Sequence, residues 1–179
     1  MGKKALLVVD ILEDFLGETR KDKDCKLYDY DKKIIKTEEY IERVNKIIDQ
    51  FKNDNDIVIY IDQEMPNKLF FRKVFGFAIK GTKGAEKVKS LKIVSNNTFT
   101  KMFGNAFTNK KLNIFLKQNS IDEVYIIGID ATKCCFFTAK GSIKNGNNTF
   151  MIKEGLATIF INDLEKCEKT IIENGGKYI

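Results

Sequence analysis

Three side chains capable of nucleophilic or acid–base chemistry follow apolar segments of this chain. Asp10 directly follows the apolar run over residues 5–9, and Cys134 follows the run that ends at Ile129. Lys101 comes shortly after a third, shorter apolar segment. A thiolate is a nucleophile, and a carboxylate can take and return a proton. Since the 179 residues include no histidine, Ser–His and Cys–His catalysis are excluded, as is any metal site that needs imidazole.

Strand and helix patterns alternate along the chain and predict the framework that holds these residues. We expect buried strands over residues 4–9, 57–61, 92–94, 124–129 and 149–152. Helical patterns cover residues 31–52, 109–118 and about 132–146, and a last helix begins at Asn162, with Glu165 completing a capping box. An irregular segment runs from Pro66 to about residue 84.

This alternation predicts the fold class and the place of the site. It indicates an α/β protein, a three-layer α/β/α sandwich with a mostly parallel, Rossmann-like sheet, in a single domain over residues 1–179. Functional residues of such folds gather outside the carboxyl ends of the strands. We therefore expect Asp10, Lys101 and Cys134 at one edge of the sheet.

Composition and charge indicate which kinds of binding partner and which cellular compartment to expect. The net charge of +6 comes from scattered lysines rather than from a basic stripe with interleaved aromatics, which argues against a nucleic-acid partner. The amino-terminal apolar run is too short for a signal peptide or a membrane span, so no membrane partner is expected. Four cysteines without a CxxC pair fit a reducing compartment. We expect a soluble, cytoplasmic protein.

Four segments, in order, resemble the isochorismatase-like cysteine hydrolase superfamily, which includes the nicotinamidase-related amidases. LLVVDILEDF at 6–15 is similar to an apolar strand followed by D-x-Q-x-D-F, and GTKGAE at 81–86 is similar to G-T-P-G-A-E. TKMFGNAF at 100–107 is similar to K-x-x-x-S-A-F, and GIDATKCCFFTA at 128–139 is similar to G-x-x-x-x-x-C-V-x-x-T-A. Each motif alone is weak, but four in the right order are hard to obtain by chance.

The resemblance implies a catalytic role for each of the three reactive residues. Cys134 would attack the carbonyl of a small amide or carbamoyl substrate, forming a thioester and releasing ammonia or an amine. Its place at a helix start, with Lys101 nearby, is expected to lower its pKa. Asp10 would act as general acid and base. The backbone N–H groups of Asp130 and Cys134 would form the oxyanion hole, with a cis peptide between Ile129 and Asp130.

Other residues would shape the substrate pocket. Five candidates were assigned to it: Phe15, Phe103, Asn105, Phe107 and Thr138. Core packing is an equally good interpretation of the three phenylalanines, and Thr138 was given at most a supporting role. Leu12 and Asn105 replace the usual Gln and Ser of the motifs, so contacts with the substrate should differ.

The resemblance also predicts that this chain needs no cofactor. Nicotinamidases of the superfamily bind a metal through an aspartate and three histidines. The corresponding D-x-H element reads Asp62-Gln63-Glu64 here, and Phe77 stands at the later histidine position. Asp62 and Glu64 could still hold a hard cation weakly, but no histidine site can form. Nicotinamidase activity is therefore not expected, and Cys134 argues against isochorismatase activity.

Two alternatives to the hydrolase remain. The chain could be a non-catalytic member that binds a small ligand in the same pocket, or Cys134 and Cys135 could form a redox-sensing pair. Cys135 occupies the valine position of the motif and should point into the core, about 100° around the helix from Cys134. Family members are commonly homodimers or homotetramers, so self-association is expected.

Overall fold

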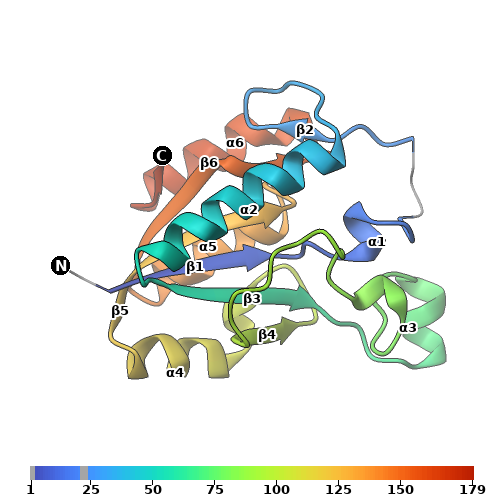
Figure 1. The fold of residues 1–179 in the computed structure, drawn as a ribbon, viewed down its shortest axis with the longest axis horizontal. Helices are drawn as coiled ribbons and strands as arrows, with labels where there is room; N and C mark the ends of the chain where they lie inside the picture. Colours follow the sequence, from blue (N-terminus) through green and yellow to red (C-terminus); the bar gives the residue numbers. More distant parts are fainter. Residues whose placement is uncertain (1–2, 21–23) are drawn as a thin grey trace.

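A seven-stranded sheet forms the centre of the molecule (Figure 1). The computed structural model describes residues 3–20 and 24–179. The strands follow the order β2-β6-β5-β1-β3-β4, with β7 also paired to β6, and only β2 is antiparallel to its neighbour. The strands are β1 (Lys3–Val9), β2 (Tyr28–Asp29), β3 (Ile57–Gln63), β4 (Thr98–Lys101), β5 (Ile121–Ile129), β6 (Asn148–Thr158) and β7 (Lys177–Tyr178).

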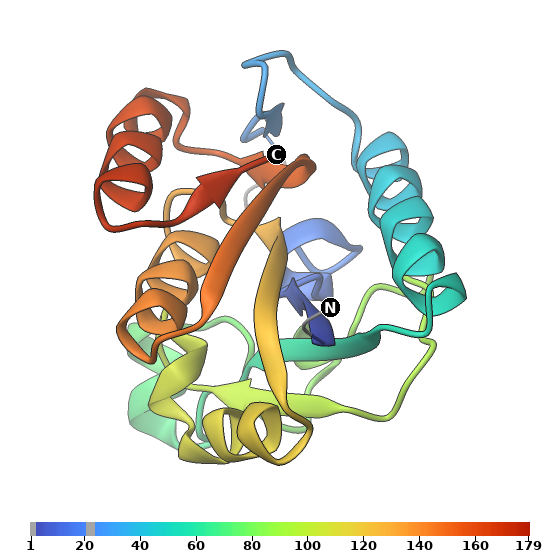
Figure 2. The same ribbon diagram turned by 90° about the vertical axis from the view of Figure 1, so that its left-hand side faces the viewer.

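Helices cover both faces of this sheet, as Figure 2 shows in an end-on view. The α-helices are α1 (Glu13–Leu16), α2 (Thr37–Asn53), α3 (Leu69–Val74), α4 (Lys110–Gln118), α5 (Cys134–Lys144) and α6 (Leu164–Glu173). Short 3-10 turns are η1 (Lys83–Ala85), η2 (Ala106–Thr108) and η3 (Ile161–Asp163). Helix α2 lies on one face, and α4, α5 and α6 lie on the other. The predicted three-layer α/β/α sandwich is confirmed.

The central strand β1 contributes to both halves of the core. Ala5, Leu7 and Val9 pack toward the α4–α5–α6 side, whereas Leu6 and Val8 pack toward α2. All five are at most 2% exposed. Successive side chains of a strand point to opposite faces, so a strand covered on both faces must be apolar throughout.

Parallel pairing brings the carboxyl ends of the central strands to one edge. Val9 of β1 pairs with Ile61 of β3 and Gly128 of β5, and Gln63 pairs with Lys101 of β4. Residues that follow these positions therefore emerge side by side. This edge, at the arrowheads of β1, β3 and β4 in Figure 1, is where the reactive residues lie.

Several predicted boundaries were wrong. No strand forms at residues 92–94, because the Lys92 and Val94 N–H groups donate to the side chains of Asn45 and Tyr60. The strand of this region is β4, and Lys101 is its last residue rather than part of a following loop.

Four further elements differ from the expectation. Helix α2 begins at Thr37 rather than residue 31, since residues 29–33 form a turn closed on the Asp29 side chain. Strand β6 extends to Thr158, and α3 forms inside the segment expected to be irregular. The capping box at Asn162 is not formed, because η3 precedes α6 and Asp163 stands at the N-cap position.

None of the helices in the described part of the chain combines the length and apolar character needed to cross a lipid bilayer.

Candidate active site

Asp10 is held rigidly where β1 ends. Its backbone has φ 55° and its N–H donates to the Ile61 carbonyl at 2.8 Å. One carboxylate oxygen accepts from the Gln63 N–H at 2.8 Å, and the other accepts from Lys101 Nζ at 2.7 Å. With 1% exposure, the carboxylate depends on these partners for its solvation.

Lys101 joins the other two reactive residues from the end of β4. Its fully buried Nζ lies 2.7 Å from Asp10 Oδ2 and 3.3 Å from Cys134 Sγ. Burial opposes its charge, but Asp10 and Cys134 outweigh that effect and raise the pKa of the Lys101 ammonium. Lys101 is therefore a fixed positive charge between a carboxylate and a thiol.

Cys134 is the first residue of α5, and its side chain borders a cavity. Burial, followed by the negative charge of Asp10, raises the pKa of this thiol to about 12, although Lys101 acts in the opposite direction. The expectation of a lowered pKa was wrong, because it omitted burial and the adjacent carboxylate. The resting group is therefore a thiol.

The loop between β5 and α5 is anchored by Asp130. The Ile129–Asp130 peptide bond is cis, as the resemblance led us to expect. The Asp130 carboxylate accepts from the Ile159 N–H and the Thr158 hydroxyl, and from the N–H and hydroxyl of Thr132, at 2.7–2.8 Å. These bonds fix the backbone that leads to the reactive thiol.

The same loop, as far as the described residues show, leaves two backbone N–H groups without a backbone acceptor. Among the N–H groups of residues 131–135, those of 131, 132, 133 and 135 donate to Ala157 O or to Asp130 oxygens. Within the described residues, the N–H groups of Cys134 and Asp130 donate to none of these acceptors. Both predicted oxyanion-hole donors are therefore available to a ligand.

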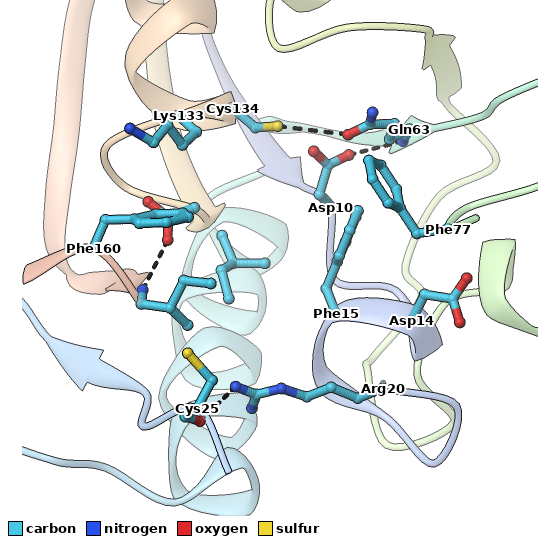
Figure 3. A pocket seen from close by; sticks show the side chains of 13 residues that line it. Asp10, Asp14, Phe15, Arg20, Cys25, Gln63, Phe77, Lys133, Cys134 and Phe160 are labelled. Atoms are coloured by element: carbon cyan, nitrogen blue, oxygen red, sulfur yellow. Dashed lines mark hydrogen bonds between the residues drawn. The ribbon is translucent and has the colours of Figure 1, made fainter. Parts of the chain in front are cut away.

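A cavity of about 390 Å³ opens beside these residues (Figure 3). Cys134, Asp10 and Gln63 lie at one end of it, whereas Arg20 and Cys25 lie at the other. The walls between them are mainly apolar: Phe15, Phe77, Ile129, Ile159 and Phe160. Phe15 and Phe77 contact each other, with ring centroids 5.7 Å apart. An apolar cavity with a few polar groups toward its ends is typical of a small-molecule site.

Of the five residues assigned to the pocket, only Phe15 lines this cavity. Phe103 is 55% exposed beside Phe75, and Phe107 is buried in the core. Thr138 is buried between the Gly104 carbonyl and the Ala106 N–H, and the Asn105 side chain caps η2. The structure therefore places these four residues outside the lining of this cavity, because the motif that contains residues 103–107 turns away from it after Lys101.

Sequence reasoning missed most of the cavity wall. Phe160 follows β6, whose end lay beyond the predicted strand. Lys133 stands at the N-cap position of α5, and its ammonium lies 4.7 Å from the centroid of the Phe160 ring. Gln63 carried one available signal, since it comes two residues after the predicted strand over residues 57–61. Phe77 was considered only as a replaced histidine.

The residues at the family's metal position do not fit a metal ion. Asp62 is paired with Lys87, and Glu64 lies 3.0 Å from Lys80. Phe77 supplies no donor atom, and the described residues contain no cluster of three His, Cys, Asp or Glu side chains suited to a metal. Lysine ammonium groups therefore satisfy the carboxylates that a cation would need.

The Cys134–Cys135 pair is divided between two environments. Cys135 is 0% exposed and packs in the core, whereas Cys134 lines the cavity. Burial raises the pKa of the Cys135 thiol well above its usual range. An oxidant in the cavity reaches one thiol of the pair, and a redox pair gains no support.

Comparisons with known proteins place the chain in one family. The isochorismatase domain model matches residues 4–170. YrdC of Bacillus subtilis (strain 168), an isochorismatase family protein, is 31% identical over 163 residues, or 90% of this chain and 77% of that protein.

Solved structures share the fold at lower identity. N-carbamoylsarcosine amidase from Thermoplasma acidophilum superposes with a TM-score of 0.78 at 20% identity, covering 98% of this chain and 95% of that one. Pyrazinamidase of Pyrococcus horikoshii, solved in complex with zinc, gives 0.80 at 21% identity, with coverages of 99% and 98%.

Proposed function

Because the chain belongs to the isochorismatase family, we propose that it is a cysteine hydrolase that cleaves a small amide or carbamoyl C–N bond through a thioester at Cys134. The observation that carries the proposal is the position of Lys101 Nζ, 2.7 Å from the Asp10 carboxylate and 3.3 Å from the Cys134 thiol at the cavity wall. Base, cation and nucleophile thereby converge without imidazole.

In the first half of the reaction, Asp10 takes the thiol proton while Sγ attacks the carbonyl carbon. The Asp130 and Cys134 N–H groups stabilise the oxyanion that develops. Asp10 then gives its proton to the leaving nitrogen, the C–N bond breaks, and ammonia or an amine departs. A thioester remains on Cys134.

In the second half, Asp10 takes a proton from water, whose oxygen attacks the thioester carbonyl. The C–S bond breaks, the sulfur regains its proton from Asp10, and the acid leaves. Lys101 stabilises negative charge on the sulfur whenever its proton is absent. Burial of the trio strengthens each of these interactions relative to water.

The apolar cavity walls support a substrate whose acyl part is apolar and fits within about 390 Å³. Asp62 and Glu64 are paired with lysines at the family's metal position, which supports a reaction that requires no bound cation.

Turnover of a panel of small amides and carbamoyl compounds, followed by ammonia release, tests this function. Cys134→Ala should lower kcat by roughly a thousandfold or more, since it removes the nucleophile. Cys167→Ala, a matched thiol deletion outside the cavity, should retain activity within a few fold. Equal turnover by wild type and Cys134→Ala would overturn the proposal. Retention of a panel compound without turnover would favour the ligand-binding alternative instead.

A further inference from the structure

Among the described residues that line the cavity, Gln63 is the one with a side-chain amide. It is the last residue of β3 and is 7% exposed. Its backbone N–H donates to Asp10 Oδ1 at 2.8 Å, which positions the base independently of the Gln63 side chain. The mechanism above assigns that side chain no task.

The Gln63 amide group has only one orientation that satisfies its partners. Its Nε2 donates to the Met102 carbonyl at 3.0 Å, and a carbonyl oxygen can only accept. This bond leaves Oε1 facing the thiol, 3.7 Å from Cys134 Sγ, as the dashed line in Figure 3 shows. An acceptor is thereby fixed beside the sulfur, where it accepts a hydrogen bond from the resting thiol.

Catalysis removes that donor. When the thiol proton moves to Asp10, Oε1 loses its partner on a buried wall, and Lys101 Nζ is already engaged with Asp10 and the sulfur. An acceptor left without a donor in such a place raises the free energy of the state. A leaving group that carries an N–H restores the bond, whereas an ester oxygen or a fully substituted nitrogen does not.

We propose that Gln63 selects substrates whose leaving nitrogen carries an N–H, namely primary and mono-substituted amides and carbamoyl compounds, over esters and tertiary amides. This inference rests on the proposed function and narrows its substrate class. Gln63 takes and gives no proton, so it is a specificity-determining residue; the proton passes from Sγ to Asp10 and then to the leaving nitrogen. Sites built to bond an N–H reject analogues that lack it.

Gln63→Met tests the proposal, because methionine has similar length and keeps the backbone N–H that positions Asp10. For one acyl group accepted by the wild type, kcat/KM is measured with the primary amide, the N,N-dimethyl amide and the methyl ester. The variant should lose roughly ten- to a hundredfold on the primary amide and less than about threefold on the ester. Gln118→Met, at the exposed end of α4, is the matched control and should change neither.

An equal loss on amide and ester would overturn the inference by indicating a merely structural role, and so would unchanged selectivity. A second readout needs no turnover. It is the ratio of Cys134 alkylation rates with iodoacetamide and its N,N-dimethyl analogue, normalised to Cys25 and mapped by mass spectrometry. The ratio should fall several fold in Gln63→Met. If wild type hydrolyses no amide, the proposed function fails, while this ratio still accepts or rejects the role of Gln63.

Discussion

At the scale of single residues, the reactive trio (Asp10, Lys101 and Cys134) combines two opposed electrostatic effects on the Cys134 sulfur. Asp10 disfavours the thiolate and Lys101 favours it, and burial adds to the effect of Asp10. The result is a thiol in the resting state, so the proposed mechanism requires Asp10 as the proton acceptor. In that mechanism, proton transfer to Asp10 accompanies the attack and replaces the imidazole base that this chain lacks.

This balance predicts that the two charges have opposite effects on alkylation. Because the pKa of Cys134 is raised to about 12, iodoacetamide should label it slowly at pH 7 and about tenfold faster per pH unit as pH rises toward 12. Asp10→Asn removes the raising charge and should speed labelling at pH 8, although turnover is lost. Lys101→Met should slow labelling. The measurement is peptide mass mapping against Cys25 as the internal reference thiol.

Two alkylation results would contradict this prediction. If Lys101→Met labels faster than wild type, or if Asp10→Asn labels more slowly, the electrostatic account of the trio is wrong.

At the scale of elements, the site depends on how closely β1 and β5 approach where they end. Gly128 has φ +130°, and a Cβ there would lie 2.1 Å from the Val9 carbonyl oxygen. Val9 immediately precedes Asp10. Gly128 immediately precedes the cis peptide Ile129–Asp130, which leads to Cys134. A side chain at position 128 would therefore push apart the two backbones that lead to Asp10 and Cys134.

Gly128→Ala should destabilise the protein by about 3 kcal/mol or more, since it adds a backbone clash to an unfavourable φ. Gly146→Ala is the matched control: Gly146 has φ +84° but no atom within 4 Å of the added Cβ, so it should cost only about 1 kcal/mol. Urea unfolding of both variants measures the difference. Equal losses would mean that the close approach of β1 and β5 contributes nothing beyond backbone strain.

At the scale of the whole molecule, burial of ionisable groups couples the site to global stability. The folded protein retains the Cys134 proton up to a pKa of about 12, whereas an unfolded chain releases it near 9. Between these values the folded state binds more protons, so the free energy of unfolding falls as pH rises. The raised pKa of Lys101 acts in the same direction, since its stabilising charge is lost at high pH.

We therefore predict an alkaline loss of stability that Cys134→Ala partly removes. Above pH 9, each proton difference lowers the unfolding free energy by about 1.4 kcal/mol per pH unit. Melting temperatures measured from pH 8 to pH 11 should fall less steeply for Cys134→Ala than for wild type, with Cys25→Ala as control. Parallel curves for wild type and Cys134→Ala would contradict the raised pKa of this thiol.

Self-association, expected from the resemblance, stays a prediction that light scattering of the purified protein checks.

The sequence by itself determined the fold class, and it singled out the three residues that the proposed mechanism uses. The apolar run of β1 ending at Asp10, and the run of β5 followed closely by Cys134, are local patterns, and parallel strands place their carboxyl ends at one edge. The four motifs added the family because they depend on residue order alone. Strand–helix alternation was sufficient for the three layers even where boundaries such as β4 and α2 were misplaced.

The tertiary structure decided what surrounds those residues. Phe77 and Phe160 line the cavity, whereas Phe107 and Thr138 do not. The packing of distant segments decides this, and no spacing along the chain encodes it. The raised pKa of Cys134 likewise reflects burial and the place of Asp10, 124 residues away in sequence but beside it in the fold. The orientation of Gln63 required the Met102 carbonyl from another strand's end, because a side-chain amide is oriented only by the partners that folding brings to it.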